Sequence, residues 1–146
     1  MFYAKTVGAL AGALLIGSAT FAAGPARAAL AQANSDSSDK VHVEVTELKR
    51  TSGNTVTVKA VIVNDSTKTY NPHSMSAAYL LDTDNRKKLT VAKDEKKKAL
   101  TSNLHSVPPG GRGEVWAKFG APADSVQKMT VVIPKFSPME DVPLGK

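Results

Sequence analysis

The sequence predicts an all-β protein, an antiparallel β-sandwich of about seven short strands that follows a cleaved signal peptide. Several stretches alternate apolar and polar residues with a period of two, which is typical of strands with one buried face. Clusters of glycine, proline, asparagine and aspartate separate these stretches at short intervals, as expected for turns between strands. Beyond the export signal no helical period exceeds one or two turns, so we expect no helical layer.

Residues 1–28 have the parts of a secretory signal peptide. Lys5 gives a weakly positive start, and residues 7–23 are apolar or small. Small residues then follow in the A-x-A spacing of signal peptidase sites, which allows cleavage after Ala28, Ala31 or Ala33. A retained membrane anchor is the weaker alternative, because this stretch is short of the roughly 20 apolar residues that a span needs. We therefore expect no stable membrane span after cleavage.

The composition of the remaining chain indicates one exported domain. The sequence has no cysteine, which excludes a lipid-modified cysteine, disulfides and a thiol nucleophile. Without the signal, 17 of the 19 basic and all 13 acidic residues remain, for a net charge of +4. This charge is mild and no aromatic platform is interleaved with it, so we expect no nucleic-acid partner. The expected location is periplasmic or secreted, in a bacterium.

The domain is expected to begin at Val41, after a polar tether. Residues 29–40 are mostly small and polar, which predicts a disordered segment, and the sandwich then covers residues 41–146. Residues 41–45 alternate with a period of two, and residues 55–63 are almost entirely β-branched. Since a Gly-Asn turn lies between these two runs, they predict a β-hairpin.

The rest of the chain predicts five further strands. They cover residues 77–81, 88–92, 114–119, 129–133 and 142–144. The last contains Pro143 and is expected at a sheet edge, where proline is tolerated. In the strand 114–119, Trp116 and Lys118 share one side and the apolar residues the other. We expect Trp116, the only tryptophan, to be a core or half-buried residue rather than a platform for a ligand.

Short motifs in the chain resemble a group of uncharacterised bacterial secreted domains. The motifs are Tyr79-Leu80-Leu81-Asp82, Pro108-Pro109-Gly110-Gly111, Trp116-Ala117-Lys118-Phe119, Val131-Val132-Ile133-Pro134 and Glu140-Asp141-Val142-Pro143-Leu144. The resemblance covers residues 42–144. Such domains are similar to immunoglobulin-like sandwiches and sometimes accompany OmpA-like envelope modules. The resemblance therefore implies an immunoglobulin-like architecture and a place in the envelope, while the motifs themselves mark turns and strand ends.

No motif predicts an enzyme or a cofactor. None of His42, His73 and His105 stands in a nucleophile motif, and no G-x-S-x-G occurs. Asp82 to Asn85 suggests calcium, but the glycine and distal glutamate of an EF-hand loop are missing and lysines follow. Turn capping is the expected role of these side chains. We expect a non-enzymatic protein with no catalytic residue.

Basic residues provide the candidate contact surface. They form two groups: Arg86, Lys87 and Lys88, then Lys93, Lys96, Lys97 and Lys98. If residues 82–89 form a hairpin turn, the groups lie at its opposite ends. We expect them to contact an envelope or secreted protein, or an anionic surface, with electrostatic steering. The alternative is a solvated charged loop that discourages aggregation at a sheet edge.

A small periplasmic carrier of copper or another ligand is the competing function. His73 and Met75 form an H-x-M pair, and histidine and methionine suit copper. Further histidines and methionines could converge on the pair, namely His42, His105, Met129 and Met139. The simpler interpretation is that Met75 packs beneath its loop and His73 is solvated.

Overall fold

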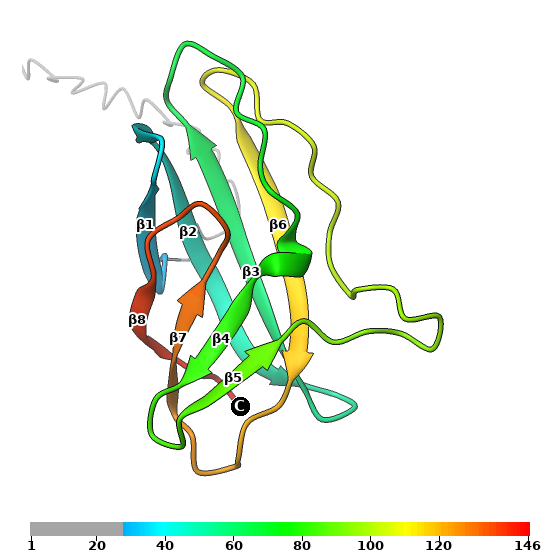
Figure 1. Cartoon of the computed structure of the whole chain (residues 1–146). Helices are drawn as coiled ribbons and strands as arrows, with labels where there is room; N and C mark the ends of the chain where they lie inside the picture. The colour runs from blue at the N-terminus through cyan, green and yellow to red at the C-terminus, as the bar shows by residue number, and fades with distance from the viewer. Residues whose placement is uncertain (1–27) are drawn as a thin grey trace, which may run out of the picture.

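A computed structural model describes residues 28–146, and the expected signal peptide lies almost wholly outside the described residues. Two antiparallel four-stranded sheets pack face to face in a β-sandwich, which confirms the predicted fold class (Figure 1). The first sheet has the order β1-β2-β3-β6 and the second β5-β4-β7-β8. The strands are β1 (Ala31–Ser35), β2 (Ser38–Thr51), β3 (Thr55–Asn64), β4 (Tyr79–Asp82), β5 (Lys87–Thr90), β6 (Arg112–Gly120), β7 (Lys128–Val132) and β8 (Met139–Pro143).

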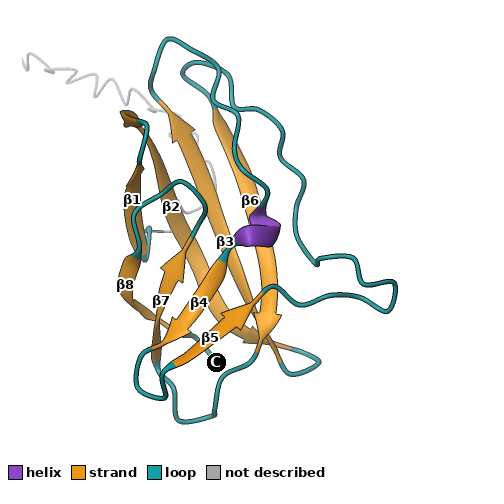
Figure 2. Ribbon diagram, in the orientation of Figure 1, coloured by secondary structure: helices purple, strands orange, loops and turns teal. Residues whose placement is uncertain are grey.

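The single helical element among residues 28–146 is a 3-10 turn, η1 (Met75–Ala77), which lies against β6 (Figure 2). Its amino-terminal end is capped by the Ser74 side chain, which accepts a hydrogen bond from the N–H of Ser76. None of the described residues forms a helix long and apolar enough to cross a membrane. Buried apolar residues from both sheets form one hydrophobic core.

β2 and β3 form the predicted hairpin, and their alternation makes one face of the first sheet apolar. From Val41 to Val45 every second residue of β2 is buried against the second sheet. The pairing with β3 then skips Thr46, so this residue forms a β-bulge. Beyond the bulge Leu48 faces the core at 2% exposure. The bulge thus shifts the alternation by one residue, so that Leu48 follows Val45 on the inward face.

The prediction of a disordered tether over residues 29–40 is wrong for most of its length. β1 occupies five of these residues and pairs antiparallel with the first half of β2, which itself begins at Ser38. Ala33 and Ser35 point inward and are buried. Composition does not reveal this strand, because its inward side chains are small and its partner supplies the backbone hydrogen bonds.

The second sheet consists of shorter strands. The central strand β4 buries Leu80 completely, opposite Val131 of β7. Tyr79 and Leu81 share a face as predicted, but it is the outer face of the sheet, where both are half-buried. β8 contains Pro143 and is an edge strand, as expected. The sandwich thus has eight strands where the sequence predicts about seven.

Isolated bridges join the two sheets along both sides. On one side Val91, directly after β5, bridges Phe119 of β6. On the other side Ser35 bridges Phe136, and Gly145 pairs in parallel with β2. The chain that follows each edge strand therefore covers part of the neighbouring edge, which limits the exposed length of both sheets.

Asn64, the last residue of β3, fastens the loops at one end of the sandwich. Its side chain is fully buried. Its Nδ2 donates to the carbonyl oxygens of Lys68, Val107 and Pro108 at 2.8, 3.0 and 3.3 Å. Its Oδ1 accepts from the N–H and the hydroxyl of Ser66 at 3.0 and 2.6 Å. The turn that begins at Pro108 therefore has a structural role.

Arg50 has a similar task at the opposite end of β3. Its guanidinium donates to the carbonyl oxygens of Pro122, Ala123 and Val126 at 3.1, 2.7 and 3.2 Å. These carbonyls belong to the loop between β6 and β7. A charged donor that satisfies three carbonyls holds this loop against the end of the sandwich.

Candidate partner-binding surface

The first basic group lies where β4 turns into β5. Arg86 closes the turn, and Lys87 and Lys88 begin β5; all three are exposed. The turn is shaped by the buried Asp82, whose two carboxylate oxygens accept from the N–H and the side-chain amide of Asn85 at 3.2 and 2.8 Å. Asp82 therefore has the turn-capping role expected from the sequence.

Lys88 folds over an aromatic ring instead of extending into solvent. Its Nζ lies 4.2 Å from the centroid of the Tyr79 ring, within cation–π distance. A shallow depression of about 360 Å³ adjoins this contact. It is lined by Leu81, Asp82, Thr83, Arg86, Lys87 and Lys88. The first group thus has one lysine committed to an intramolecular contact.

The second basic group lies on a hairpin that projects from the sandwich, which we call the lysine hairpin (Lys93–Ala99; Figure 1). Its two ends form an antiparallel bridge. The N–H of Lys97 donates to the carbonyl of Asp94 at 2.9 Å, and the N–H of Asp94 donates to that of Lys98 at 2.9 Å. These bonds close a tight turn, so the hairpin has a defined shape.

The carboxylate of Asp94 is used by the turn itself. Its Oδ1 accepts from the N–H groups of Lys96 and Lys98 at 2.9 and 2.8 Å. All four lysines of the hairpin are exposed, and none forms an ion pair with a carboxylate of residues 28–146. The hairpin therefore carries four ammonium groups and two carboxylates, those of Asp94 and Glu95, so its charge is positive.

The base of the lysine hairpin is held against β6. Ala92 donates its N–H to the carbonyl of Lys118 at 2.8 Å, and its own carbonyl accepts from Leu100 at 2.9 Å. Lys118 in turn donates to Leu100 at 3.0 Å. These interlaced bonds, in the middle of a strand edge, fix the direction in which the hairpin leaves the sandwich.

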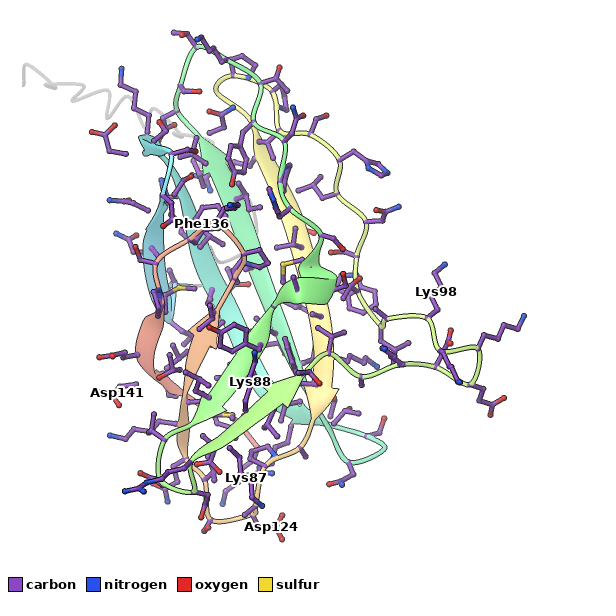
Figure 3. The ribbon with its side chains drawn as sticks, in the orientation of Figure 1. Lys87, Lys88, Lys98, Asp124, Phe136 and Asp141 are labelled. Atoms are coloured by element: carbon purple, nitrogen blue, oxygen red, sulfur yellow. The ribbon has the colours of Figure 1, made fainter. Side chains whose placement is uncertain are left out.

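The first basic group lies in the turn before β5 and on its first two residues, and the second follows the end of this strand. Figure 3 shows Lys87 and Lys88 on the body of the sandwich and Lys98 on the projecting hairpin. The four residues between the groups, 89–92, span roughly 13 Å if extended, at about 3.3 Å for each residue. The groups are therefore two separate surfaces, and a small partner would contact one of them.

The structure places His73 and Met75 in different environments. Met75 is 3% exposed and belongs to the core, whereas His73 is exposed in the preceding loop. The methionines at 129 and 139 are also buried in the core. His42 is occupied, with Nε2 3.0 Å from Oε1 of Glu44. Across residues 28–146 no three histidine or carboxylate side chains are grouped as metal ligands.

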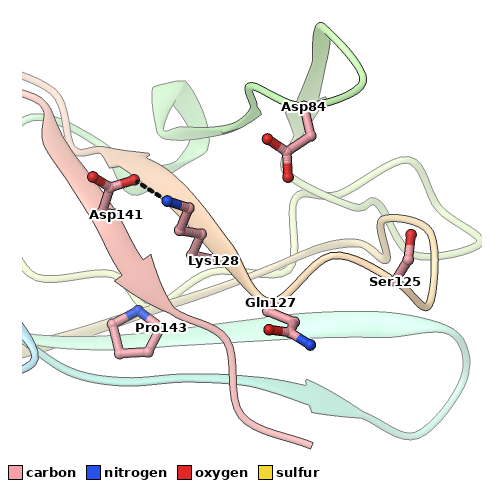
Figure 4. A pocket seen from close by; sticks show the side chains of 6 residues that line it. All are labelled: Asp84, Ser125, Gln127, Lys128, Asp141 and Pro143. Carbon is pink, nitrogen blue, oxygen red and sulfur yellow. Dashed lines mark ion pairs between the residues drawn. The ribbon is translucent and has the colours of Figure 1, made fainter.

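A second open depression, of about 420 Å³, lies beside β8 (Figure 4). Its lining comprises Asp84, Ser125, Gln127, Lys128, Asp141 and Pro143. Lys128 Nζ and Asp141 Oδ1 form an ion pair at 3.1 Å, and both side chains are largely exposed. No histidine is among these six residues, so the lining offers Ser125 no imidazole base.

Trp116 lies on the outer face of the first sheet. It is 38% exposed, opposite Lys59 of β3. The predicted separation of Trp116 and Lys118 from the apolar side of the strand is confirmed. The expectation of a core or half-buried residue is therefore wrong, because Trp116 is an exposed residue. Its backbone N–H donates to the Ser102 hydroxyl at 2.8 Å.

The chain matches no protein family model, and comparison with curated proteins and with solved structures found no match either. Its own surface is thus the basis for a functional proposal. Of the features above, the lysine hairpin is a shaped and anchored projection whose charged groups have no role in the core.

Proposed function

We propose that this protein is an exported, non-enzymatic interaction module of the bacterial envelope. Its sandwich, immunoglobulin-like in our proposal, is the scaffold, and the lysine hairpin binds an acidic segment of an envelope or secreted protein. The observation that carries this proposal is the ordered turn of the hairpin, whose single capping carboxylate leaves four lysines unpaired. A shaped loop loses less conformational entropy on binding than a flexible one.

The position of the hairpin favours binding over protection of a sheet edge. Protective lysines normally lie on an exposed edge strand, where they block pairing with another chain. Here the edge of β6 is already covered by Ala92 and by Thr101, which bridges Ala117. The lysines lie beyond this cover, on the projecting part of the hairpin. Edge protection therefore does not account for them.

The side chains of the hairpin favour a protein over a membrane as the partner. From Lys93 to Lys98 every residue is charged, so no apolar side chain is available to enter a bilayer. Peripheral membrane binding is strong when apolar burial adds to electrostatic attraction. An acidic peptide needs only charge complementarity, which also raises the association rate.

The test is photo-cross-linking in the producing bacterium, with a cross-linker at position 95. We expect one cross-linked partner, and the triple variant Lys96→Glu, Lys97→Glu, Lys98→Glu should reduce its yield roughly tenfold or more, as for charge reversal in a steered interface. The matched control reverses three exposed lysines elsewhere, Lys40, Lys68 and Lys146. It changes the net charge equally and should retain the partner.

Other outcomes contradict the proposal in different ways. An equal loss in both triple variants would show that only net charge matters. Retention of the partner by the hairpin variant would exclude the hairpin as the contact. Binding of the purified mature protein to phosphatidylglycerol vesicles, with no cross-linked protein in cells, would replace the protein partner with an anionic lipid surface.

A further inference from the structure

The three A-x-A sites differ in their position relative to β1. Ala28 and Ala29 are exposed and precede the strand, in a segment without regular structure. Ala31 is the first residue of β1, and Ala33 lies in its middle with 9% exposure. Only the bond between Ala28 and Ala29 can therefore be cut without shortening the strand.

Cleavage at either later site would remove parts of the first sheet. The N–H of Leu30 donates to the carbonyl of Val45 at 2.7 Å, and this bond is lost in a product that starts at Gln32. A product that starts at Asn34 lacks three of the five residues of β1. Residues 43–45 of β2, which pair with the lost residues, would then form a free edge.

The new amino terminus has a second consequence, because it carries a positive charge. At Ala29 this charge stands in solvent, ahead of the paired residues. At Asn34 it would stand beside Ser35, which is 8% exposed, and next to the bridge of Ser35 with Phe136. Asn34 itself is exposed, so this charge would not be buried, but it would stand at a residue that pairs with His42 inside the sheet.

We propose that signal peptidase cuts between Ala28 and Ala29, so that the mature chain keeps β1 complete and starts two residues ahead of it. Ala26 and Ala28 supply the two small residues that the enzyme requires. This inference rests on the export that we propose above. It adds the processing site and a reason for it, which is the pairing of β1 with β2.

The test is the amino-terminal sequence and intact mass of the protein recovered from the periplasm or medium of a bacterium that expresses the full chain. We expect a mature chain that begins at Ala29. A chain that begins at Gln32 or Asn34 would overturn the processing site while export stands. An uncut chain retained in the cell would overturn both this inference and export.

Two variants of the full chain sharpen the result. Ala28→Leu places a large residue at the expected cleavage site and should abolish the product that starts at Ala29. A diverted product, starting at Gln32 or Asn34, should accumulate to a lower level because β1 is damaged. Ala31→Leu is the matched control and should leave the Ala29 terminus unchanged. If Ala28→Leu still yields Ala29, the proposal fails.

Discussion

Two regions that connect strands of the sandwich are held in place in different ways. The loops fastened by Asn64, residues 64–72 and 107–111, which we call the Asn64 loops, are tied by a fully buried side chain with five hydrogen bonds. The lysine hairpin is tied by backbone bonds and by the exposed carboxylate of Asp94. In the Asn64 loops the polar groups of the buried side chain are used internally. The four lysines of the hairpin are exposed and form no ion pair with a carboxylate of residues 28–146.

Backbone conformation repeats this contrast. The Asn64 loops place Gly110 at φ +70°, a conformation that glycine adopts without a steric cost. The hairpin places Lys97 at φ 61°, where a residue with a Cβ costs roughly 1–2 kcal/mol. The turn of the lysine hairpin therefore has the more strained backbone of the two regions.

The largest expected effect follows from Asn64→Asp. This isosteric change turns Nδ2, a donor to three carbonyls, into a carboxylate oxygen that faces them. We expect the free energy of unfolding to fall by about 3–5 kcal/mol at pH 7, as for an uncompensated buried charge. Urea denaturation measures the loss, which should shrink at low pH as the carboxyl group becomes protonated.

A matched variant separates the charge from the lost hydrogen bonds. Asn64→Ala removes the side-chain donor and acceptor without adding a charge, and it should lower the free energy of unfolding by roughly 1–3 kcal/mol. Its loss of stability should not depend on acidic pH in the same way. Equal and small effects of the two substitutions would contradict the assignment of Asn64 as the fastening residue.

The next effect tests the neighbouring pair His73 and Met75. Met75→Ala should lower the free energy of unfolding by about 2–4 kcal/mol, because it opens a cavity in the core. His73→Ala should change it by less than about 0.5 kcal/mol, as for an exposed residue. Metal analysis of the purified mature protein is the deciding measurement: copper that is lost in His73→Ala would support the carrier alternative.

These differences show how far sequence reasoning reaches in this protein. The runs at 41–45, 55–63 and 114–119 predict strands correctly, because alternation or β-branching directly reflects a buried face. β1 escapes prediction, since Ala33 and Ser35 are too small to signal a strand and their partner lies beyond the next turn. Pairing partners are long-range facts that local composition does not hold.

The candidate surface was predictable as exposed charge but not as a shape. The two basic groups and their exposure follow from the charged runs in the sequence. The turn that orders the second group depends on Asp94, and a run in which every residue is charged does not show which carboxylate caps the turn. The structural role of Asn64 is equally invisible, because its acceptors at Val107 and Pro108 are over forty residues away.

A smaller effect is expected for Asp94→Ala. The variant loses two turn bonds on an exposed hairpin, so global stability should fall by less than about 1 kcal/mol. Hydrogen exchange at the amides of Lys96 and Lys98 should accelerate, and partner cross-linking should weaken because the turn loses its shape. Asp65→Ala makes the same charge change at another exposed site and should do neither. Unchanged exchange in Asp94→Ala would contradict the ordered hairpin.

The smallest effect concerns the pH response of the Asn64 loops. Burial raises the pKa of Tyr70, and the charge of Asp36 adds to this, while a hydrogen bond with Ser35 partly opposes it. The folded state thus holds the phenol proton more tightly than the unfolded chain does. The stability from this difference is complete below the ordinary pKa near 10 and is lost as pH rises through the higher folded value.

Tyrosinate absorbance and hydrogen exchange test this pH response together. We expect one absorbance step displaced to higher pH, and Tyr70→Phe should remove it. Tyr70 and Val107 form two backbone hydrogen bonds with each other, at 2.9 and 2.8 Å. Ionisation of the Tyr70 phenol should therefore lower the protection of the Val107 amide from hydrogen exchange. The amides of the lysine hairpin have no such link and serve as the internal control. After correction for the base-catalysed rise of exchange at every amide, a simultaneous loss of protection in both regions would show that base unfolds the whole sandwich, and the contrast between them would not extend to alkaline pH.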